Sequence, residues 1–345
     1  MTRKSISGES IIRDVVTAYP GVKDVFQAHG LKCSSCWISA VETIFGGART
    51  HRIEVEPLLR DIHQFLADGT LPRVTGSPLL PMAQKVPAEK LDKGDIGHIV
   101  AVMSGKGGVG KSLVTGLLAV SLARSGYRVG ILDADITGPS IPKMFGLHQR
   151  VPVRQKRIEP GMSMYGIKIM SMNLMLERED IGVTWRGPMV SQSIKQFFSD
   201  VAWGELDYLL VDLPPGTSDA PMTVLQALPL DGVVLVSTPQ ALTGMVVSKA
   251  IKMVQKMHVP ILGLVENMGY LILPDSGQPF ELFGPSQSAA LVGESGAPMI
   301  GRLPLDPEIA RLCDAGKIEE YHSAPYAELS ENLHTALDIA EAVPV

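Results

Sequence analysis

Two short segments of the sequence hold side chains that could do chemistry. The first, GKGGVGKS at residues 105–112, combines glycines with two lysines and a serine, and the second, CSSC, places Cys33 and Cys36 two residues apart. Glycine-rich backbone beside a lysine and a hydroxyl is typical of phosphate binding. A Cys-x-x-Cys pair occurs in metal sites, in redox dithiols and in structural pairs. The sequence therefore predicts a phosphate site and leaves the role of the cysteines open.

The glycine segment fits two known patterns. Its spacing satisfies the dinucleotide fingerprint G-x-G-x-x-G, for which Asp133, at the end of the next apolar run, could bind a ribose. It also satisfies the phosphate-binding loop G-x4-G-K-S. Lys111 and Ser112 favour this second pattern, because an ammonium facing β- and γ-phosphates and a hydroxyl bound to Mg²⁺ suit a triphosphate. Asp212 ends a later apolar run, where it could hold the Mg²⁺.

We interpret the segment as a P-loop that binds ATP with Mg²⁺, held by Ser112 and Asp212. The nucleotide contacts expected from the loop are Gly105, Lys106, Gly107, Gly108, Val109, Gly110, Lys111, Ser112 and Leu113.

The elements that must position these residues are recognisable as apolar runs of strand length. Segments of helical period alternate with them, and strands that are apolar on both faces indicate a parallel sheet covered by helices on each side. The fold class is therefore α/β, a P-loop nucleotidase with a mainly parallel sheet flanked by helices. The runs are HIVAVMS at 98–104, YRVGILD at 127–133, YLLVD at 208–212, GVVLVS at 232–237 and PILGLVEN at 260–267.

The sequence divides into three parts. Residues 1–70 show short amphipathic helical patterns, including an apolar stripe from Leu58 to Leu66 that stops at Gly69, and predict a small all-α domain with CSSC at a helix start. Residues 71–96 are rich in proline and predict a linker. Residues 97–345 form the predicted ATPase domain.

Composition excludes several partners. The 345 residues are 45% hydrophobic and carry a net charge of −5, without a basic patch, so we expect neither nucleic acid nor membrane as a partner. No apolar run is long enough to span a bilayer and no secretory leader precedes the first domain, so we expect a cytoplasmic protein. Three cysteines cannot form a disulfide framework.

Further motifs make the sequence resemble a known family. DADITGPS at 133–140, STPQ at 237–240, VENM at 265–268 and IGRLPLDPEIA at 300–310 accompany the loop. Together they resemble the Mrp/ApbC family of P-loop ATPases that carry iron-sulfur clusters, within the wider MinD-like group, over about residues 97–320. The resemblance implies a homodimer that binds ATP·Mg²⁺ between its subunits and hydrolyses ATP slowly.

The resemblance also implies roles for single residues. Lys106 matches the signature lysine of this deviant Walker A loop, which is expected to reach the nucleotide of the facing subunit. Lys111 would bind phosphate, and Asp135 would position the attacking water. Asn267 and Pro304 match positions that contact adenine. Leu113 departs from the family, which usually has threonine there, and the lost hydroxyl predicts modestly weaker nucleotide binding.

A larger departure concerns the cluster ligands. The family carries a Cys-x-x-Cys after VENM that bridges one cluster across the dimer, but Leu273 and Ser276 occupy those positions here. A [4Fe-4S] cluster normally needs four thiolates, which two CSSC pairs could supply in a dimer. The N-terminal segment resembles the redox-disulfide domain associated with hybrid-cluster proteins. Cys33 and Cys36 are therefore cluster or metal ligands, a redox dithiol, or a structural pair.

The main interpretation is an ATPase that assists assembly or transfer of iron-sulfur clusters to apo recipient or scaffold proteins. Two alternatives stay open. One is a MinD-like nucleotide-gated switch that has lost cluster carriage, and the other is a thiol-redox module controlled by the ATPase. Cys313 lies on an apolar helical stripe and is expected to be packing, and His29 is expected to be a polar cap.

Overall fold

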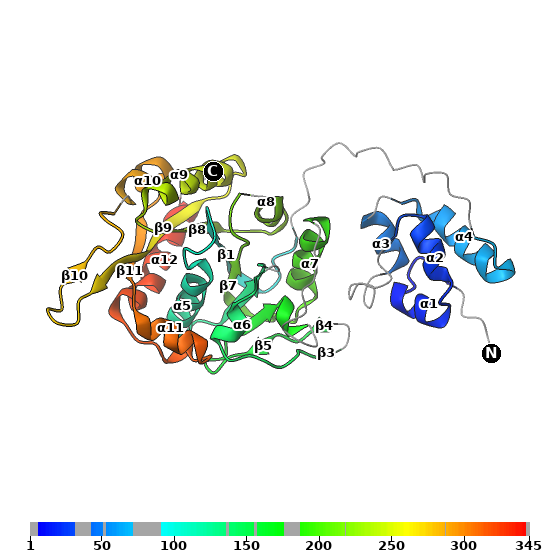
Figure 1. Ribbon diagram of the computed structural model, residues 1–345, viewed down its shortest axis with the longest axis horizontal. Helices are drawn as coiled ribbons and strands as arrows, with labels where there is room; N and C mark the ends of the chain where they lie inside the picture. The colour runs from blue at the N-terminus through cyan, green and yellow to red at the C-terminus, as the bar shows by residue number, and fades with distance from the viewer. Residues whose placement is uncertain are drawn as a thin grey trace. The chain divides into compact units, whose positions relative to one another are not determined.

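The computed structural model of the chain divides into two compact units, Met1–Pro87 and Ala88–Val345 (Figure 1). The residues that the structure describes are 6–31, 43–50, 53–71, 91–135, 138–154, 157–175, 187–217, 219–286 and 288–342.

The first unit is a small helical bundle with its own core. Its helices are α1 (Ile12–Ala18), α2 (Val22–Ala28), α3 (Ile44–Thr50) and α4 (Val55–Asp68). The apolar stripe predicted from the sequence lies on α4, where Leu58 and Ile62 are fully buried and pack with Phe26 of α2. The helix ends at Gly69, which adopts the left-handed conformation that glycine tolerates best. Cys33 and Cys36 lie outside the described residues.

The second unit is built on a nine-stranded sheet. Its strands are β1 (Ile96–Ser104), β2 (Val129–Asp133), β5 (Gly161–Met162), β6 (Lys168–Ser171), β7 (Leu206–Asp212), β8 (Gly232–Ser237), β9 (Ile261–Ile272), β10 (Pro279–Phe280) and β11 (Met299–Pro304). They run in the order β10-β9-β8-β1-β7-β2-β6-β5, and β11 also pairs with β9. All pairings are parallel except those of β10 and β5, and a separate short ribbon joins β3 (Val153–Arg154) to β4 (Arg157–Ile158).

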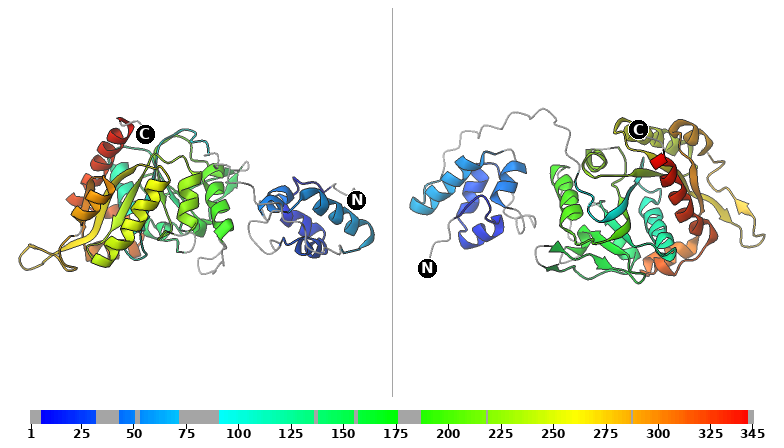
Figure 2. Two further views of the ribbon diagram at one scale, coloured as in Figure 1. Left: turned by 90° about the horizontal axis from the view of Figure 1, so that it is seen from above. Right: turned by 180° about the vertical axis from the view of Figure 1, so that it is seen from behind.

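Helices cover both faces of this sheet (Figure 2). They are α5 (Lys111–Arg124), α6 (Ile141–Met144), α7 (Gly187–Asp200), α8 (Asp219–Ala227), α9 (Ala241–Lys256), α10 (Ser288–Ser295), α11 (Pro307–Asp314) and α12 (Ala324–Ala342), with 3-10 turns η3 (Met172–Leu174) and η4 (Ile318–Glu320). The pair α5 and α12 lies against one face, and the pairs α7–α8 and α9–α10 lie against the other. The α/β class expected from the sequence is confirmed.

The central strands explain where chemistry can occur. Every residue of β2 and β8 is buried, as strands covered on both faces require. Because the neighbouring strands are parallel, their carboxyl ends meet at one edge of the sheet, where ligands bind in open α/β folds. Asp133 and Asp212 are direct partners in the β2–β7 register at that edge.

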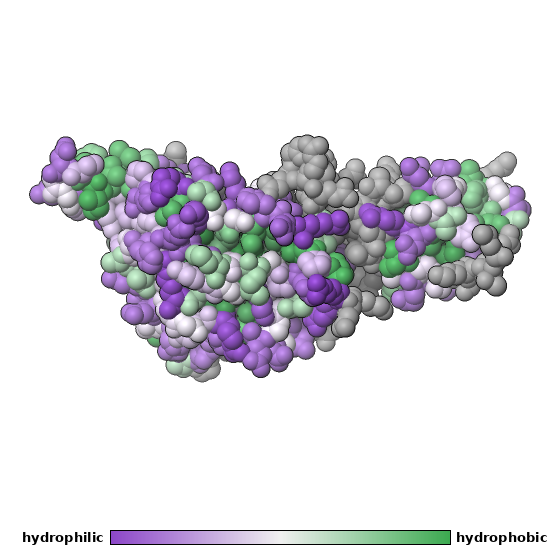
Figure 3. Space-filling view, turned by 90° about the horizontal axis from the view of Figure 1, so that it is seen from below, coloured by the Kyte–Doolittle hydropathy of each residue, from purple (hydrophilic) through white to green (hydrophobic). Residues whose placement is uncertain are grey.

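Strands β9 and β10 form a hairpin that projects from the sheet (Figure 1). Leu273 and Ser276, at the positions where the related family has cysteines, lie in its turn, and the Leu273 amide donates to the carbonyl of Gln278. The hairpin and the residues after it expose a hydrophobic surface (Figure 3), to which Ile272, Phe280, Leu282 and Phe283 contribute. Among the described helices, none is both long and apolar enough to cross a membrane.

Candidate functional site

The glycine loop connects β1 to α5 and is held tightly on two sides. A side chain at Gly105 would come within 2.7 Å of the Val246 carbonyl, so the loop packs directly on the backbone of α9. Gly110 has a φ of +79°, and a side chain there would overlap the Asn267 amide. Both positions therefore require glycine. Helix α5 begins directly after the loop, at Lys111. The free amide groups at its N-terminus therefore point toward the loop.

Three side chains of α5 converge on one buried carboxylate. Asp212, at the end of β7, is fully buried, and its Oδ1 lies 2.7 Å from the Lys111 ammonium. Ser112 donates its hydroxyl to Oδ2 at 2.5 Å, and the Thr115 hydroxyl lies 2.8 Å from Oδ1. The P-loop lysine and serine and the strand-end aspartate, predicted from separate motifs, are thus brought together at the carboxyl edge.

The donor set at Asp212 suits a hard divalent cation. Mg²⁺ prefers oxygen ligands and is usually held by one or two carboxylates or hydroxyls together with phosphates and water. The Ser112 hydroxyl and the Asp212 carboxylate supply such oxygens side by side. In the part of the chain that the structure describes, no group of three or more His, Cys, Asp and Glu side chains forms a metal site.

A second carboxylate lies behind the first. Asp133 is fully buried, and its oxygens accept hydrogen bonds from the Ser171 hydroxyl at 3.0 Å and from the Asp135 amide at 3.2 Å. Burial, followed by repulsion from the charge of Asp212, raises the pKa of Asp133 to about 8. At this edge Asp212 is paired with Lys111, whereas burial favours the protonated form of Asp133.

Lys106 and Asp135, to which the family resemblance gives charge stabilisation and water positioning, are less buried than Asp212. The half-buried Lys106 donates from its ammonium to the Gln240 side-chain oxygen at 3.2 Å, at the start of α9. Asp135 is half-buried after β2, and its carboxylate accepts from the Gly138 amide at 3.3 Å. Both side chains are thus positioned by neighbouring loops at the same edge as Lys111.

Asn267 and Pro304, the predicted adenine contacts, are both buried. The Asn267 amide donates to the Val109 carbonyl at 3.0 Å and so ties β9 to the P-loop. The Pro304 carbonyl accepts from the Tyr326 hydroxyl at 3.5 Å. These contacts hold the loop and the end of β11 in place, and the adenine contacts stay a prediction.

Two residues of the site were not expected from the sequence. Thr115 lies four residues after Lys111 and three after Ser112, so all three occupy one face of α5. The spacing of Thr115 from Lys111 and Ser112 could therefore have predicted its place in the site. No local pattern predicts Gln240, because only the fold brings STPQ beside the P-loop.

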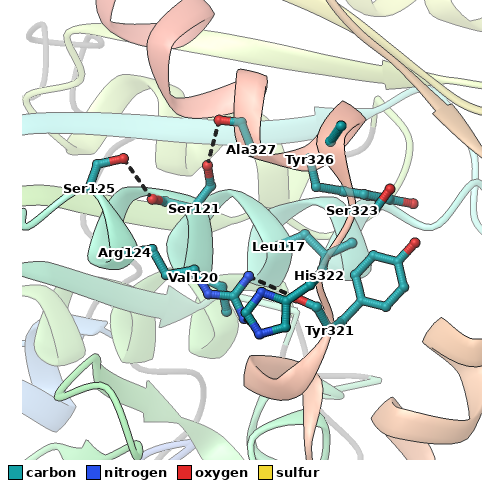
Figure 4. A pocket seen from close by; sticks show the side chains of 11 residues that line it. Leu117, Val120, Ser121, Arg124, Ser125, Tyr321, His322, Ser323, Tyr326 and Ala327 are labelled. Carbon is teal, nitrogen blue, oxygen red and sulfur yellow. Dashed lines mark hydrogen bonds between the residues drawn. The ribbon is translucent and has the colours of Figure 1, made fainter.

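A cavity of about 500 Å³ lies elsewhere, between the second half of α5 and the start of α12 (Figure 4). Arg124 donates to the Tyr321 carbonyl at 2.8 Å, and Ser121 donates to the Ala327 carbonyl at 3.1 Å. Arg124 is about 20 Å along α5 from Lys111 at the usual helical rise. The cavity is therefore separate from the P-loop, and its polar side chains tie α5 to the C-terminal elements.

Comparison with known proteins gives two family matches. A family model described as NUBPL iron-transfer P-loop NTPase matches residues 95–341, and a model described as a domain of unknown function, DUF1858, matches residues 6–59. An iron-sulfur cluster carrier protein of Clostridium perfringens is 46% identical over 236 residues, which cover 66% of this chain and 83% of that protein. A protein of the same description from Pyrococcus horikoshii is 40% identical over 277 residues, covering 76% and 92%.

Solved structures show the same core. A nucleotide-binding protein of Archaeoglobus fulgidus, solved in complex with ADP, is 46% identical and has a TM-score of 0.61, covering 67% of this chain and 91% of that chain. The Pyrococcus furiosus cell division ATPase MinD is 21% identical, with a TM-score of 0.52 over 69% of this chain and 99% of that chain, which shows a shared fold.

Proposed function

The chain belongs to the NUBPL iron-transfer P-loop NTPase family, of the Mrp type, and from that premise we propose that it binds ATP with Mg²⁺ and hydrolyses it slowly as a homodimer. The observation that carries the proposal is the convergence of Lys111, Ser112 and Thr115 on the buried Asp212. The Archaeoglobus fulgidus relative was solved in complex with ADP, which supports nucleotide binding by this chain.

Nucleotide binding would exchange the partners of Lys111. Its ammonium lies 2.7 Å from Asp212, and this pairing compensates two charges that are both almost fully buried. Phosphates over the loop would take over this ammonium together with the amide groups at the start of α5. Asp212 and Ser112 would then hold Mg²⁺, which neutralises phosphate charge.

Lys106 is proposed to act across the dimer. Its ammonium donates to Gln240 and not to Asp212, so Lys106 is not part of the group of side chains around Asp212. A cation brought beside the phosphates of the facing subunit would stabilise negative charge in the transition state. Asp135 is proposed to position the attacking water.

The proposed cargo is an iron-sulfur cluster passed to apo recipient or scaffold proteins. Support comes from the family and from relatives described as iron-sulfur cluster carrier proteins. Leu273 and Ser276 in the β9–β10 turn cannot bind iron through sulfur, so we propose Cys33 and Cys36 as the cluster ligands of each chain. The cytoplasmic location expected from the sequence stays a prediction.

Leu273 and Ser276 also favour a second candidate function. A chain without cluster ligands in its ATPase unit could instead act as a MinD-like switch, or could control a Cys33–Cys36 dithiol. Bound iron and sulfide distinguish carriage from both alternatives.

ATP turnover tests the enzymatic part. We expect Lys106→Ala and Lys111→Ala each to abolish hydrolysis. Lys106→Ala should retain more nucleotide binding, because Lys111 contacts the buried Asp212 of its own chain whereas Lys106 contacts Gln240. Lys143→Ala is the control, since Lys143 is an exposed lysine of the same unit. Normal hydrolysis by Lys106→Ala would show that the cross-subunit mechanism is wrong.

Iron content tests the cargo. After anaerobic reconstitution we expect about two iron and two sulfide per chain, as one four-iron cluster per dimer requires. The Cys33→Ser/Cys36→Ser double variant should lose both. Absence of iron from the unsubstituted protein would favour the switch.

A further inference from the structure

The ammonium of Lys106 is held by one neutral partner. It donates to the Gln240 side-chain oxygen at 3.2 Å, and among the described residues it has no other hydrogen-bond or ion-pair partner. Lys111, in contrast, lies 2.7 Å from the carboxylate of Asp212. An amide oxygen accepts a hydrogen bond but carries no net charge, and an ammonium has three N–H donors. Lys106 therefore keeps its full charge and two donors with which to bind a ligand.

The Gln240 side chain can accept this hydrogen bond because it does not cap its own helix. Gln240 is the N-cap residue of α9, with an extended backbone (φ −61°, ψ 132°), and its side chain makes no capping hydrogen bond. The first amide groups of a helix carry partial positive charge, which disfavours an ammonium nearby. The Gln240 oxygen offsets this repulsion by accepting from Lys106 at the start of α9.

The sheet fixes the backbone on both sides of this contact. Ser104 of β1 pairs with Val236 of β8, so the P-loop and the STPQ segment leave neighbouring parallel strands at the same edge. The Ser104 hydroxyl donates to the Lys106 carbonyl at 2.9 Å, and Gly105 packs on the backbone of α9 at Val246. Because both backbones are held, the hydrogen bond restricts the long Lys106 side chain, which would otherwise populate many rotamers.

We propose that Gln240 is a positioning residue, which holds the Lys106 ammonium in one place beside the P-loop without neutralising its charge. The proposal rests on the proposed ATP hydrolysis and on the role of Lys106 in it, and deepens both. A cation that is already oriented loses less conformational entropy when it meets phosphate, and its full charge stabilises the charge of the transition state. A carboxylate at position 240 would orient Lys106 but would neutralise it.

Two substitutions at position 240 test this role in the full-length protein by steady-state turnover of ATP·Mg²⁺. Gln240→Ala removes the acceptor and should lower kcat about 10-fold or more, because the lost hydrogen bond is one to a charged group. Gln240→Glu keeps the shape and the acceptor but adds a charge, and it should lower kcat at least as far. The Kd of a fluorescent ATP analogue should stay close to that of the wild type in both variants, because Lys111 and the loop are proposed to bind that nucleotide.

Thermal stability separates a positioning role from a structural one. A negative charge at a helix N-terminus is stabilising, so Gln240→Glu should keep or raise the melting temperature of the larger unit while kcat falls. A purely structural residue would change both in the same direction. Gln255→Ala is the matched control and should leave kcat unchanged, because Gln255 is an exposed glutamine at the far end of the same helix.

The outcomes distinguish this role from the proposed function itself. Wild-type kcat in Gln240→Ala or in Gln240→Glu, while Lys106→Ala abolishes turnover, would overturn the positioning role and leave the ATPase assignment intact. A lower kcat accompanied by a lower melting temperature in both variants would also overturn it, because Gln240 would then only support the fold. Absence of turnover from the unsubstituted protein would overturn the proposed function and this role with it.

Discussion

Asp212 is the side chain on which the P-loop end of α5 converges. Its carboxylate lies 2.7 Å from the Lys111 ammonium and accepts hydrogen bonds from the α5 face. The same carboxylate and the Ser112 hydroxyl are the oxygens proposed to hold Mg²⁺. If they do so, nucleotide and Mg²⁺ would replace some of these contacts.

Thr115 predicts a stability effect at the residue scale. Its side chain is fully buried and its hydroxyl lies 2.8 Å from Asp212. Thr115→Val keeps the shape but leaves the carboxylate with one partner fewer, so the free energy of unfolding should fall by about 1–2 kcal/mol. Thr115→Ser keeps the hydroxyl and should retain that hydrogen bond. Urea denaturation measures both, and equal losses in the two variants would contradict a role for the hydrogen bond.

Asp133 predicts a pH dependence. Its pKa is raised from 3.8 to about 8, first by burial and then by the charge of Asp212. The folded state therefore binds a proton that the unfolded chain has released, and this stabilisation is complete below about pH 4 and lost as the pH rises through about 8. Asp133→Asn stays neutral throughout, so its melting temperature should fall less steeply between pH 5 and 8 than that of the wild type. If calorimetry gave the same pH dependence of the melting temperature for both proteins, Asp133 would already be ionised in this range.

At the scale of elements, β9 links the nucleotide edge to the hairpin. Asn267 binds the P-loop carbonyl of Val109, and the adjacent Glu266 is buried and paired with Arg302 at 2.8 Å. Arg302 in turn donates to the Gly269 carbonyl at the start of the hairpin. The hairpin has Leu273 and Ser276 where the related family has cysteines, and it presents the hydrophobic surface of Figure 3.

The end of α9 predicts a stabilising substitution. His258 is exposed and has a φ of +54°, and the Val259 amide donates to the Val254 carbonyl to close the helix. A left-handed conformation is unfavourable for a residue with a side chain, so His258→Gly should raise the free energy of unfolding by about 0.5–1 kcal/mol. Gly126→Ala, at the equivalent position after α5 with a φ of +92°, should lower it by about 1 kcal/mol. Urea denaturation measures both, and a decrease in both variants would refute the argument.

At the scale of the whole molecule, each unit buries its own hydrophobic core. The helical unit packs α1 to α4 around Phe26 and Ile62, and residues 91–95, at the end of the expected linker, are tied to the ATPase unit by contacts such as Lys93 with Asp231 at 2.7 Å. The larger unit therefore begins before β1, within the range 71–96 that the sequence predicted as a linker.

Separate cores predict separate responses to nucleotide. ATP·Mg²⁺ at 100 times its Kd should stabilise the larger unit by about 2.7 kcal/mol, because only its folded form binds. The transition of the helical unit should not move. Differential scanning calorimetry measures both transitions, and Lys111→Ala should remove the shift. If nucleotide shifted both unfolding transitions equally, the two units would unfold together.

The sequence by itself determined the parts of the protein that local patterns encode. The strands ending at Ser104, Asp133 and Asp212 and the helix stopping before Gly69 follow from apolar runs, helical period and a left-handed glycine. The loop composition was sufficient to predict ATP binding, because each residue type has its own function in phosphate recognition. The family resemblance built on these motifs is confirmed.

Only the tertiary structure decided which side chains share a site. Thr115 and Asp212 are 97 residues apart, and Lys106 and Gln240 are 134 apart. Such pairs depend on the order and register of parallel strands, which no local pattern specifies. The pairing of His29 with Asp61 is of the same kind, because the two residues come together only when α4 packs against α2.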